Sequence, residues 1–225
     1  MPENLAKFCP GCGYPIALTV MHRVLKERDV VNDAVLGLDI GCALLAWNFL
    51  PINTFQTHHG RVTPVMMGAK NARPESVAIG YTGDGGAYAI GWQYLCHAVR
   101  RDDPIMIVVI NNTLYGMTGG QTAPTSLQGQ VTSTDLTGVT EKEFFGPEFL
   151  RPLASPDAFI ARTAVNNPAQ MMDFYNKALD AQKAGHFSLI EILSFCPTNW
   201  GTVGAGTLTH LNDIAKVFKT GEIKK

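Results

Sequence analysis

Two short motifs carry oxygen atoms suited to a divalent cation. Asp84, in a Gly-Asp-Gly turn, offers a carboxylate oxygen, and Asn112, which closes an apolar run, offers an amide oxygen. With the peptide carbonyl of Leu114 they would suit Mg²⁺, phosphates supplying the remaining ligands. Gly85 and Gly86 would leave backbone N–H groups free for a phosphate at a helix start. A lone Gly-Asp-Gly is more typical of a tight turn, but Asn-Asn after the next strand favours the metal-binding interpretation.

The five cysteines supply a second set of candidate ligands. Cys9 and Cys12 form a C-x-x-C pair, Cys42 follows the first apolar run, and Cys196 follows the last. In a cytoplasmic chain thiols stay reduced, so grouped cysteines favour metal binding over disulfides. One pair and two single thiolates fit a four-cysteine site for zinc or for an iron–sulfur cluster, and the ligand set alone does not separate the two. Cys96 lies within a helix-compatible stretch, so we expect it to pack in the core.

The elements that must position these groups alternate between strand-like and helix-like stretches. Apolar runs of strand length cover 34–38, 77–81, 105–110, 159–165 and 187–193. Helix-compatible stretches cover 14–28, 61–72, 86–101, 168–184 and 210–219. Continuous apolar strands separated by helices indicate a parallel sheet covered on both faces. The sequence therefore predicts an α/β fold, doubly wound, with a mainly parallel sheet and helices on both faces.

Apart from the C-x-x-C pair, the candidate ligands follow predicted strands, so we expect them to meet at one edge of the sheet. The segment from Leu114 to about Pro156 is rich in Gly, Thr, Ser, Gln and Pro and has no clear period. A connection of this length is usually functional or disordered, and its position after the strongest strand favours an active-site loop at about 114–156. We predict a single domain over 1–225, with an N-terminal cysteine segment at 1–13.

Composition narrows the classes of function. Eighteen Lys and Arg against 19 Asp and Glu give a formal net charge of -1, which argues against general nucleic-acid or anionic-membrane binding. No apolar stretch approaches the ~20 residues of a membrane span. The N-terminus has no apolar segment of signal-peptide type, so we expect a cytoplasmic protein. Only 16% of the residues are charged, and we therefore expect part of the surface to be buried against other chains.

Taken together, the motifs resemble those of one enzyme family. The stretch from Gly83-Asp84-Gly85 to Asn111-Asn112 resembles the metal–diphosphate motif of thiamine-diphosphate enzymes. The continuation 115–125, with His59-Gly60-Arg61 and Cys196-Pro197-Thr198, resembles the thiamine-diphosphate-binding β subunit of the 2-oxoacid:ferredoxin oxidoreductases. The resemblance covers nearly the whole chain, from Cys9 to about Gly201.

This resemblance implies three cofactors, namely thiamine diphosphate, Mg²⁺ and a [4Fe-4S] cluster. The residues that it implies for thiamine diphosphate are Ile40, Gly41, Gly83, Asp84, Gly85, Gly86, Asn112, Leu114, Tyr115, Gly116, Met117 and Thr118. It implies Mg²⁺ ligands at Asp84, Asn112 and Leu114, and cluster ligands at Cys9, Cys12, Cys42 and Cys196. His59 and Arg61 are implied as catalytic residues that polarise the substrate or cofactor. For His58, simple capping of the turn is an equally good interpretation.

The implied reaction is coenzyme A-dependent oxidative decarboxylation of a 2-oxoacid. Electrons would pass through the cluster to ferredoxin or a ferredoxin-like δ subunit. In this family the pyrimidine-binding domain lies on a partner α or γ subunit, so we expect the chain alone to be inactive. The run 43–47 after Cys42 is apolar, where many family members carry small polar or basic residues. An apolar lining favours a branched substrate such as 2-oxoisovalerate, with 2-oxoglutarate or pyruvate as alternatives.

Two other classes of function remain open from the sequence. A non-oxidative thiamine-diphosphate decarboxylase or carboligase subunit would lack the four-cysteine set and contain no iron. A non-catalytic assembly module would bind zinc through the four cysteines, and its Gly-Asp-Gly turn would be purely structural. That module would contain zinc and no thiamine diphosphate.

Overall fold

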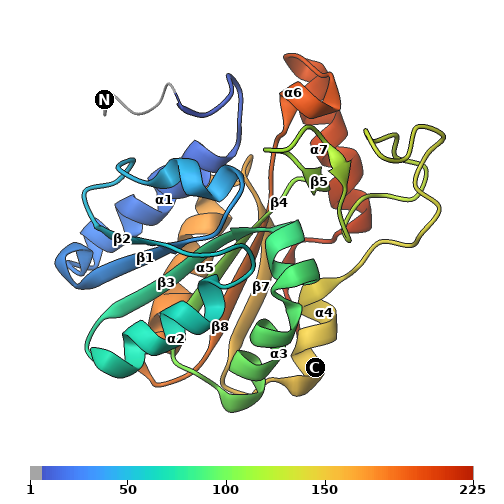
Figure 1. Ribbon diagram of the computed structural model, residues 1–225. Helices are drawn as coiled ribbons and strands as arrows, with labels where there is room; N and C mark the ends of the chain where they lie inside the picture. The colour runs from blue at the N-terminus through green and yellow to red at the C-terminus, as the bar shows by residue number, and fades with distance from the viewer. Residues whose placement is uncertain (1–6, 225) are drawn as a thin grey trace.

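The computed structural model describes residues 7–224, and its centre is a seven-stranded sheet (Figure 1). The strands lie in the order β2-β1-β3-β4-β8-β7-β9, and neighbours are parallel except β7 and β9. Their bounds are β1 (Ala34–Leu38), β2 (Asn53–Gln56), β3 (Val77–Gly83), β4 (Met106–Asn111), β7 (Phe159–Ala164), β8 (Ser188–Leu193) and β9 (Gly221–Glu222). Every residue of β4 and β8 is buried, as expected for central strands covered on both faces.

Helices cover both faces of this sheet. One hydrophobic cluster joins the sheet to α1 (Tyr14–Glu27), α5 (Pro168–Lys183) and α7 (Ala205–Val217). A second cluster joins it to α2 (Val62–Ala72), α3 (Trp92–Arg101) and α4 (Gly146–Leu150). In Figure 1, α2 and α3 lie in front of the sheet and α5 lies behind it. The predicted doubly wound α/β fold is confirmed.

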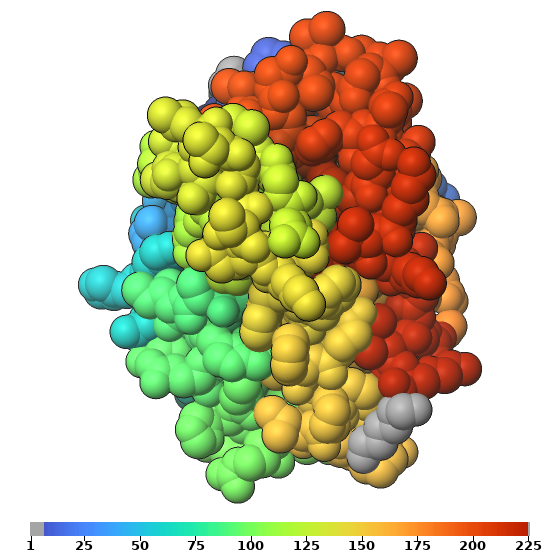
Figure 2. Space-filling view, turned by 90° about the vertical axis from the view of Figure 1, so that its right-hand side faces the viewer, coloured from blue at the N-terminus to red at the C-terminus, as the bar shows by residue number. Residues whose placement is uncertain are grey.

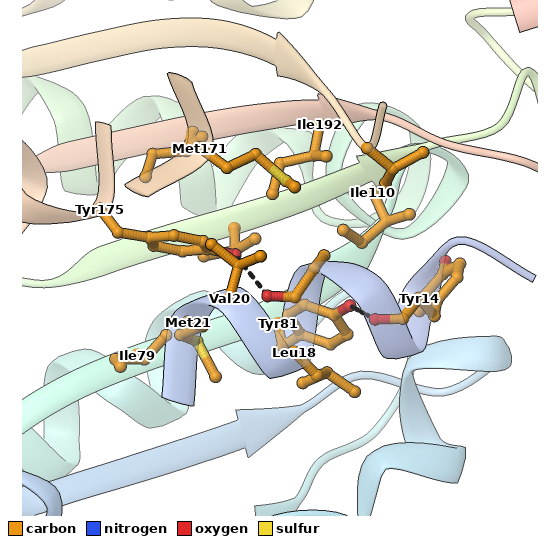
Figure 3. Packing of buried hydrophobic residues seen from close by; sticks show 14 of the residues in the cluster. Tyr14, Leu18, Val20, Met21, Ile79, Tyr81, Ile110, Met171, Tyr175 and Ile192 are labelled. Carbon is orange, nitrogen blue, oxygen red and sulfur yellow. Dashed lines mark hydrogen bonds between the residues drawn. The ribbon is translucent and has the colours of Figure 1, made fainter. Parts of the chain in front are cut away.

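The first cluster fixes α1 against the sheet (Figure 3). Tyr81 of β3 and Tyr175 of α5 are fully buried, and each phenol hydroxyl donates to a backbone carbonyl of α1. The acceptors are the carbonyls of Tyr14, at 3.2 Å, and Ala17, at 3.4 Å. Both hydroxyls are thereby satisfied although they lie in the core. The N-terminal end of α1 is held beside the carboxyl end of β3 as a result.

The order of the strands creates a switch point between β1 and β3. From β1 the chain moves outward to β2 on one side, and β3 and β4 then extend the sheet on the other side. In open parallel sheets, ligands bind outside the carboxyl ends of the strands at such a point. The loops after β1 and β3 are therefore placed to line a ligand site.

The structure differs from the sequence prediction in three elements. The stretch 86–101 is not one helix, because a π-helical turn, η4 (Gly86–Ile90), precedes α3, and Gly91 N–H donates to the Gly86 carbonyl at 2.9 Å. Such π turns occur often at functional sites. Strand β2 was missed because its residues are mostly exposed and form no apolar run. Helix α7 begins at Ala205, earlier than the predicted residue 210.

The predicted loop at 114–156 is irregular but not devoid of regular structure. It contains the hairpin of β5 (Leu114–Tyr115) and β6 (Gln121–Thr122), then α4 and the 3₁₀ turn η5 (Arg151–Leu153). Figure 2 shows this segment, yellow-green to yellow, against the orange and red C-terminal helices. The rings of Phe145 and Phe218 make one of these contacts, with centroids 5.1 Å apart. The segment is thus packed onto the domain.

Three short helical elements complete the described chain. They are the 3₁₀ turns η2 (Val31–Asp33) and η3 (Cys42–Ala46) and the one-turn helix α6 (Pro197–Trp200). Cys42 is the first residue of η3, and Cys196 is the N-cap residue of α6. Each of these two candidate cluster ligands therefore lies at the start of a short helical element. Within residues 7–224, no helix has the length and apolar character needed to cross a membrane.

Candidate functional site

A cavity of about 120 Å³ lies at the carboxyl ends of β1, β3 and β4. All twelve residues predicted for cofactor binding line it, together with three others, Tyr14, Cys42 and His59. The twelve come from three loops that are far apart in the sequence, and the parallel register of the sheet brings them together. Gly83 at the end of β3, for example, lies opposite Ile110 of β4. The cavity is therefore the candidate site.

Asp84 and Asn112 provide two buried oxygen acceptors at this cavity. Asp84 is 2% exposed, and the Thr125 hydroxyl donates to its Oδ2. Burial raises the pKa of Asp84 to about 7. Asn112 Oδ1 is buried and receives no hydrogen bond in the structure. Because an unpaired buried acceptor and an uncompensated buried carboxylate are both costly, these two groups fit a Mg²⁺ ion, which prefers such oxygens.

The two glycines after Asp84 serve close packing. A Cβ atom on Gly85 would lie 2.1 Å from the Tyr115 ring, and one on Gly86 would lie 2.0 Å from Asp39 Oδ2. Glycine is therefore needed at both positions to let Tyr115 and Asp39 approach the turn. This requirement was not foreseen from the sequence, which suggested only a free phosphate-binding helix start.

Asp39 is a site residue that the sequence reasoning missed. Its fully buried carboxylate accepts hydrogen bonds from Ile40 N–H at 2.8 Å, Gly60 N–H at 2.7 Å and the Thr82 hydroxyl at 2.6 Å. These donors belong to the loops after β1 and β2 and to β3. One carboxylate thus connects the two loops and the strand that surround this part of the site. The available signal was an acidic residue directly after a continuous apolar strand.

The predicted catalytic residues His59 and Arg61 are placed differently. His59 lines the cavity, with its ring edge-on to Tyr115 and its Nδ1 3.5 Å from Asp39 Oδ1. Arg61 does not line the cavity; its guanidinium lies 4.7 Å from the Tyr94 ring centroid. His58 is exposed, and its carbonyl accepts from the Arg61 backbone N–H at 2.9 Å. Within this chain His59 is therefore the residue positioned to touch a ligand.

Four of the cysteines gather at one end of the same site. The sulfurs of Cys42 and Cys196 lie 3.4 and 3.5 Å from where a Cβ atom of Gly116 would sit. Cys12 donates its backbone N–H to the Cys9 carbonyl at 3.0 Å, which closes the C-x-x-C turn. Burial, with a smaller contribution from the neighbouring cysteines, raises the pKa of Cys12 and of Cys42 to about 12. Thiols in such surroundings ionise when a metal centre supplies positive charge.

The spacing of these thiols bears on which metal centre they fit. Among residues 7–224, no three His, Cys, Asp or Glu side chains are close enough to hold a single metal ion. An iron–sulfur cubane is wider than one ion, so its four ligands are further apart than those of zinc. The four thiols remain the candidate ligands for the predicted iron–sulfur cluster. Of the predicted segment 1–13, residues 1–6 lie outside the described residues, whereas Cys96 packs against the second hydrophobic cluster as expected.

The short helix α6 contacts both Cys196, a candidate cluster ligand, and Asn112, a candidate Mg²⁺ ligand. Asn199 Nδ2 is 3.4 Å from Cys196 Sγ and 2.9 Å from the Gly116 carbonyl oxygen. The indole N–H of Trp200 donates to the carbonyl of Asn112 at 3.1 Å. The Trp200 ring in turn packs against His210 of α7 in a tilted arrangement, with centroids 4.3 Å apart. None of these three side chains was singled out as a site residue from the sequence.

Comparisons with known proteins agree with this geometry. Residues 39–192 match the thiamine pyrophosphate enzyme family, C-terminal TPP binding domain. The 2-oxoglutarate synthase subunit KorB of Archaeoglobus fulgidus is 35% identical over 92% of this chain and 75% of its own length. The ketoisovalerate oxidoreductase subunit VorA of Methanothermobacter thermautotrophicus is 34% identical over 85% of this chain, which spans only 42% of that relative.

A solved structure gives the same result. The 2-oxoglutarate:ferredoxin oxidoreductase from Magnetococcus marinus, determined with 2-oxoglutarate, coenzyme A and succinyl-CoA bound, superimposes with a TM-score of 0.79. Its sequence is 26% identical, and the match covers 92% of this chain and 68% of that chain. The chain therefore belongs to the family of thiamine-diphosphate-binding β subunits of the 2-oxoacid:ferredoxin oxidoreductases.

Proposed function

We propose that this chain holds Mg²⁺-thiamine diphosphate and a [4Fe-4S] cluster in a coenzyme A-dependent 2-oxoacid:ferredoxin oxidoreductase. The observation that carries the proposal is the pair of uncompensated buried acceptors, Asp84 and Asn112 Oδ1, beside a pocket of four cysteines. Cys42 is a candidate cluster ligand and also lines the cofactor cavity. A cluster on these cysteines would therefore lie next to the cofactor, as electron transfer requires.

Different residues of the chain would bind the cation, exclude water and position the cofactor. Thiamine diphosphate, when bound, supplies the carbon nucleophile and the electron sink for decarboxylation of a 2-oxoacid. Asp84, Asn112 and the Leu114 carbonyl would hold Mg²⁺ on the diphosphate. The Tyr115 and Met117 side chains line the cavity and would exclude water from it. The remaining predicted contacts, from Ile40 and Gly41 at one wall to Gly116 and Thr118 at the other, would position the cofactor.

His59 is proposed to act on the substrate or cofactor from the cavity wall. Its Nδ1 is buried without a hydrogen-bond partner and lies near the Asp39 carboxylate, so Asp39 would orient the imidazole ring. Arg61 donates to the His59 carbonyl at 3.4 Å and stacks on Tyr94. From that position Arg61 supports the His59 loop, and a catalytic contact by Arg61 would need a rearrangement in the assembled enzyme.

A partner subunit is proposed to complete the site. Ile40 and Met117 line the cavity, yet their apolar side chains are 42% and 47% exposed. Exposed apolar groups around a cavity are typical of surfaces that another chain covers. We propose that the partner carries the pyrimidine-binding domain, that ferredoxin or a ferredoxin-like δ subunit receives the electrons, and that the complex works in the cytoplasm, where its five free cysteines stay reduced.

The substrate is proposed to be a 2-oxoacid without a second carboxylate, such as 2-oxoisovalerate. The expected apolar lining by the run 43–47 is not observed, because Ala43 and Ala46 are buried in the core and do not line the cavity. Another observation supports the same preference: no Lys or Arg occurs among the cavity-lining residues of the described chain. A second carboxylate, as in 2-oxoglutarate, would find no Lys or Arg among these lining residues. Relative turnover of 2-oxoisovalerate, 2-oxoglutarate and pyruvate by the assembled enzyme tests this, and a clear preference for 2-oxoglutarate would contradict it.

The experiment that tests the proposed function is anaerobic co-purification with the partner subunits, followed by metal and cofactor analysis. We expect iron and acid-labile sulfide in equal amounts, Mg²⁺ and thiamine diphosphate, and a broad visible absorbance from the cluster. Zinc without thiamine diphosphate would show a structural module instead. Thiamine diphosphate without iron would show a non-oxidative enzyme.

A further inference from the structure

The side-chain amide of Asn199 has two acceptors that belong to different parts of the site. Its Nδ2 atom lies 3.4 Å from the sulfur of Cys196 and 2.9 Å from the carbonyl oxygen of Gly116. An amide NH₂ group has two N–H bonds, so it can serve both acceptors at once. Asn199 thereby joins a candidate cluster ligand to the loop that lines the cofactor cavity.

The orientation of this amide follows from its partners. A carbonyl oxygen and a thiolate sulfur both accept hydrogen bonds and neither donates, so the NH₂ group and not the oxygen must face them. The opposite side of Asn199 packs against Gly120, whose position for a Cβ atom lies 3.2 Å from Asn199 Oδ1 and Cβ. Gly120 has a φ of +85°. The glycine leaves room for the asparagine, and the side chain is held in place from both sides.

We infer that Asn199 is a positioning residue that donates an N–H···S hydrogen bond to Cys196 and so raises the reduction potential of the cluster. The inference rests on the proposed function, since it takes the four cysteines as ligands of a [4Fe-4S] cluster. Hydrogen bonds to the ligand sulfurs are among the factors that set the potential of such clusters. When the cluster gains one electron, its negative charge increases, and an N–H donor stabilises the reduced form more than the oxidised form.

The second N–H group gives the same residue a contact with the cofactor loop. Gly116 lies directly between the two sulfurs and the metal end of the site: its Cβ position is 3.4 Å from Cys42 Sγ and 3.5 Å from Asn112 Nδ2. Asn199 therefore fixes both the ligand sulfur and the backbone segment that separates the cluster from the cofactor cavity.

The test is a reductive titration of the purified complex with dithionite, followed by the electron paramagnetic resonance of the reduced cluster. The variants are Asn199→Leu, which has similar size and no N–H, and Asn199→Asp, which keeps the shape and replaces the amide with a carboxylate. Asn176→Leu is the matched control, because Asn176 Nδ2 also donates to a backbone carbonyl, that of Met172 at 2.9 Å, but lies on α5. Iron and sulfide are measured in every sample.

We expect Asn199→Leu to lower the ratio of reduced to oxidised cluster about tenfold at a fixed potential, which is about 59 mV for a one-electron couple. Asn199→Asp should shift the ratio further in the same direction, and Asn176→Leu should leave it unchanged. Unchanged potentials in both Asn199 variants with intact clusters would overturn the inference. So would loss of the cluster in both while the Asn176 variant retains it, since Asn199 would then be needed for assembly. A wild-type complex without iron would instead refute the proposed function.

Discussion

Two carboxylates are buried near the carboxyl ends of the central strands, and their surroundings differ. Glu191 in β8 is fully buried; Arg162 Nε donates to it, and Asn111 Nδ2 donates to it at 3.0 Å. The same guanidinium donates two further hydrogen bonds, at 2.6 and 2.7 Å, to Glu148. Asp84 is almost as buried, but it has no ion pair among residues 7–224, and its side-chain donor is the Thr125 hydroxyl.

We infer from this difference that Glu191 has a structural role and that Asp84 has a functional role. The charge of Glu191 is compensated within the chain, so the pair needs nothing further to be stable inside the protein. The charge of Asp84 is not compensated, and burial raises its pKa to about 7. Together with the unpaired Asn112 Oδ1, Asp84 is therefore the group that we propose as a ligand of a cation from outside the chain. Four measurements test this difference between Glu191 and Asp84.

The largest effect is expected from Glu191→Ala. The substitution leaves Arg162 Nε and Asn111 Nδ2 without their acceptor and Glu148 as the remaining counterion, and breaking a buried ion pair typically costs about 3–5 kcal/mol. Urea denaturation of the metal-free chain should show this loss in the free energy of unfolding. The double variant Arg162→Met/Glu191→Leu removes both charges and should recover part of the stability. A loss of less than about 1 kcal/mol for Glu191→Ala would show that the pair is not a structural requirement.

Asp84→Asn should weaken ligand binding without destabilising the fold. Loss of a metal-binding carboxylate should weaken the affinity for Mg²⁺-thiamine diphosphate by at least about 100-fold. Isothermal titration calorimetry on the assembled complex measures this affinity. Asp135→Asn is the matched control, because Asp135 also accepts a threonine hydroxyl, that of Thr122, and does not line the cavity. Equal affinities for the two variants would remove Asp84 from the site.

The stability of the metal-free chain should depend on pH through Asp84. Its pKa is about 7 in the folded chain and 3.8 for a free aspartate side chain, so between these values the folded chain binds the extra proton. The contribution of Asp84 to stability is therefore fully present below pH 4 and is lost as the pH rises through 7, by about 2 kcal/mol from pH 5 to pH 7. The measurement is urea denaturation of the wild type at each pH, relative to Asp84→Asn. A difference between the two that does not change with pH would contradict the raised pKa.

The smallest effect is expected at the surface. Arg23 and Glu27 form an exposed ion pair on α1, at 2.8 Å, with side chains 66% and 48% exposed. Arg23→Met should change the free energy of unfolding by no more than about 0.5 kcal/mol. Thermal or urea denaturation measures the change. An effect as large as that of Glu191→Ala would show that burial is not what distinguishes these pairs.

The sequence predicted most of the sheet because its central strands are continuous apolar runs. Strands β1, β3, β4, β7 and β8 each lie within about two residues of a predicted run. Strand β2 lies at the edge and is largely exposed, so hydrophobic patterning had nothing to detect. The π turn at Gly86–Ile90 was also missed, because helical periodicity does not distinguish it from the start of an α-helix.

The sequence predicted the site residues that belong to recognisable motifs, and it did not predict the residues that connect distant loops. The twelve predicted cofactor residues meet at one cavity because they follow neighbouring strands. Asp39 and Asn199 were overlooked, since the loops that each holds together are distant in sequence. Arg162 lies in the weakest predicted strand, and nothing local to it indicates that Glu191 is its partner. These pairings exist only once the strands are side by side.

The central claim is that Asp84 and Asn112 hold a divalent cation on the diphosphate of the cofactor. It is tested most directly by measuring the affinity of the assembled, cofactor-free complex for thiamine diphosphate, first with Mg²⁺ and then with EDTA. We predict that binding requires the cation and that Asp84→Asn lowers the affinity measured with Mg²⁺ by at least about 100-fold, toward the affinity measured with EDTA. Equal binding of thiamine diphosphate with and without Mg²⁺ would contradict it.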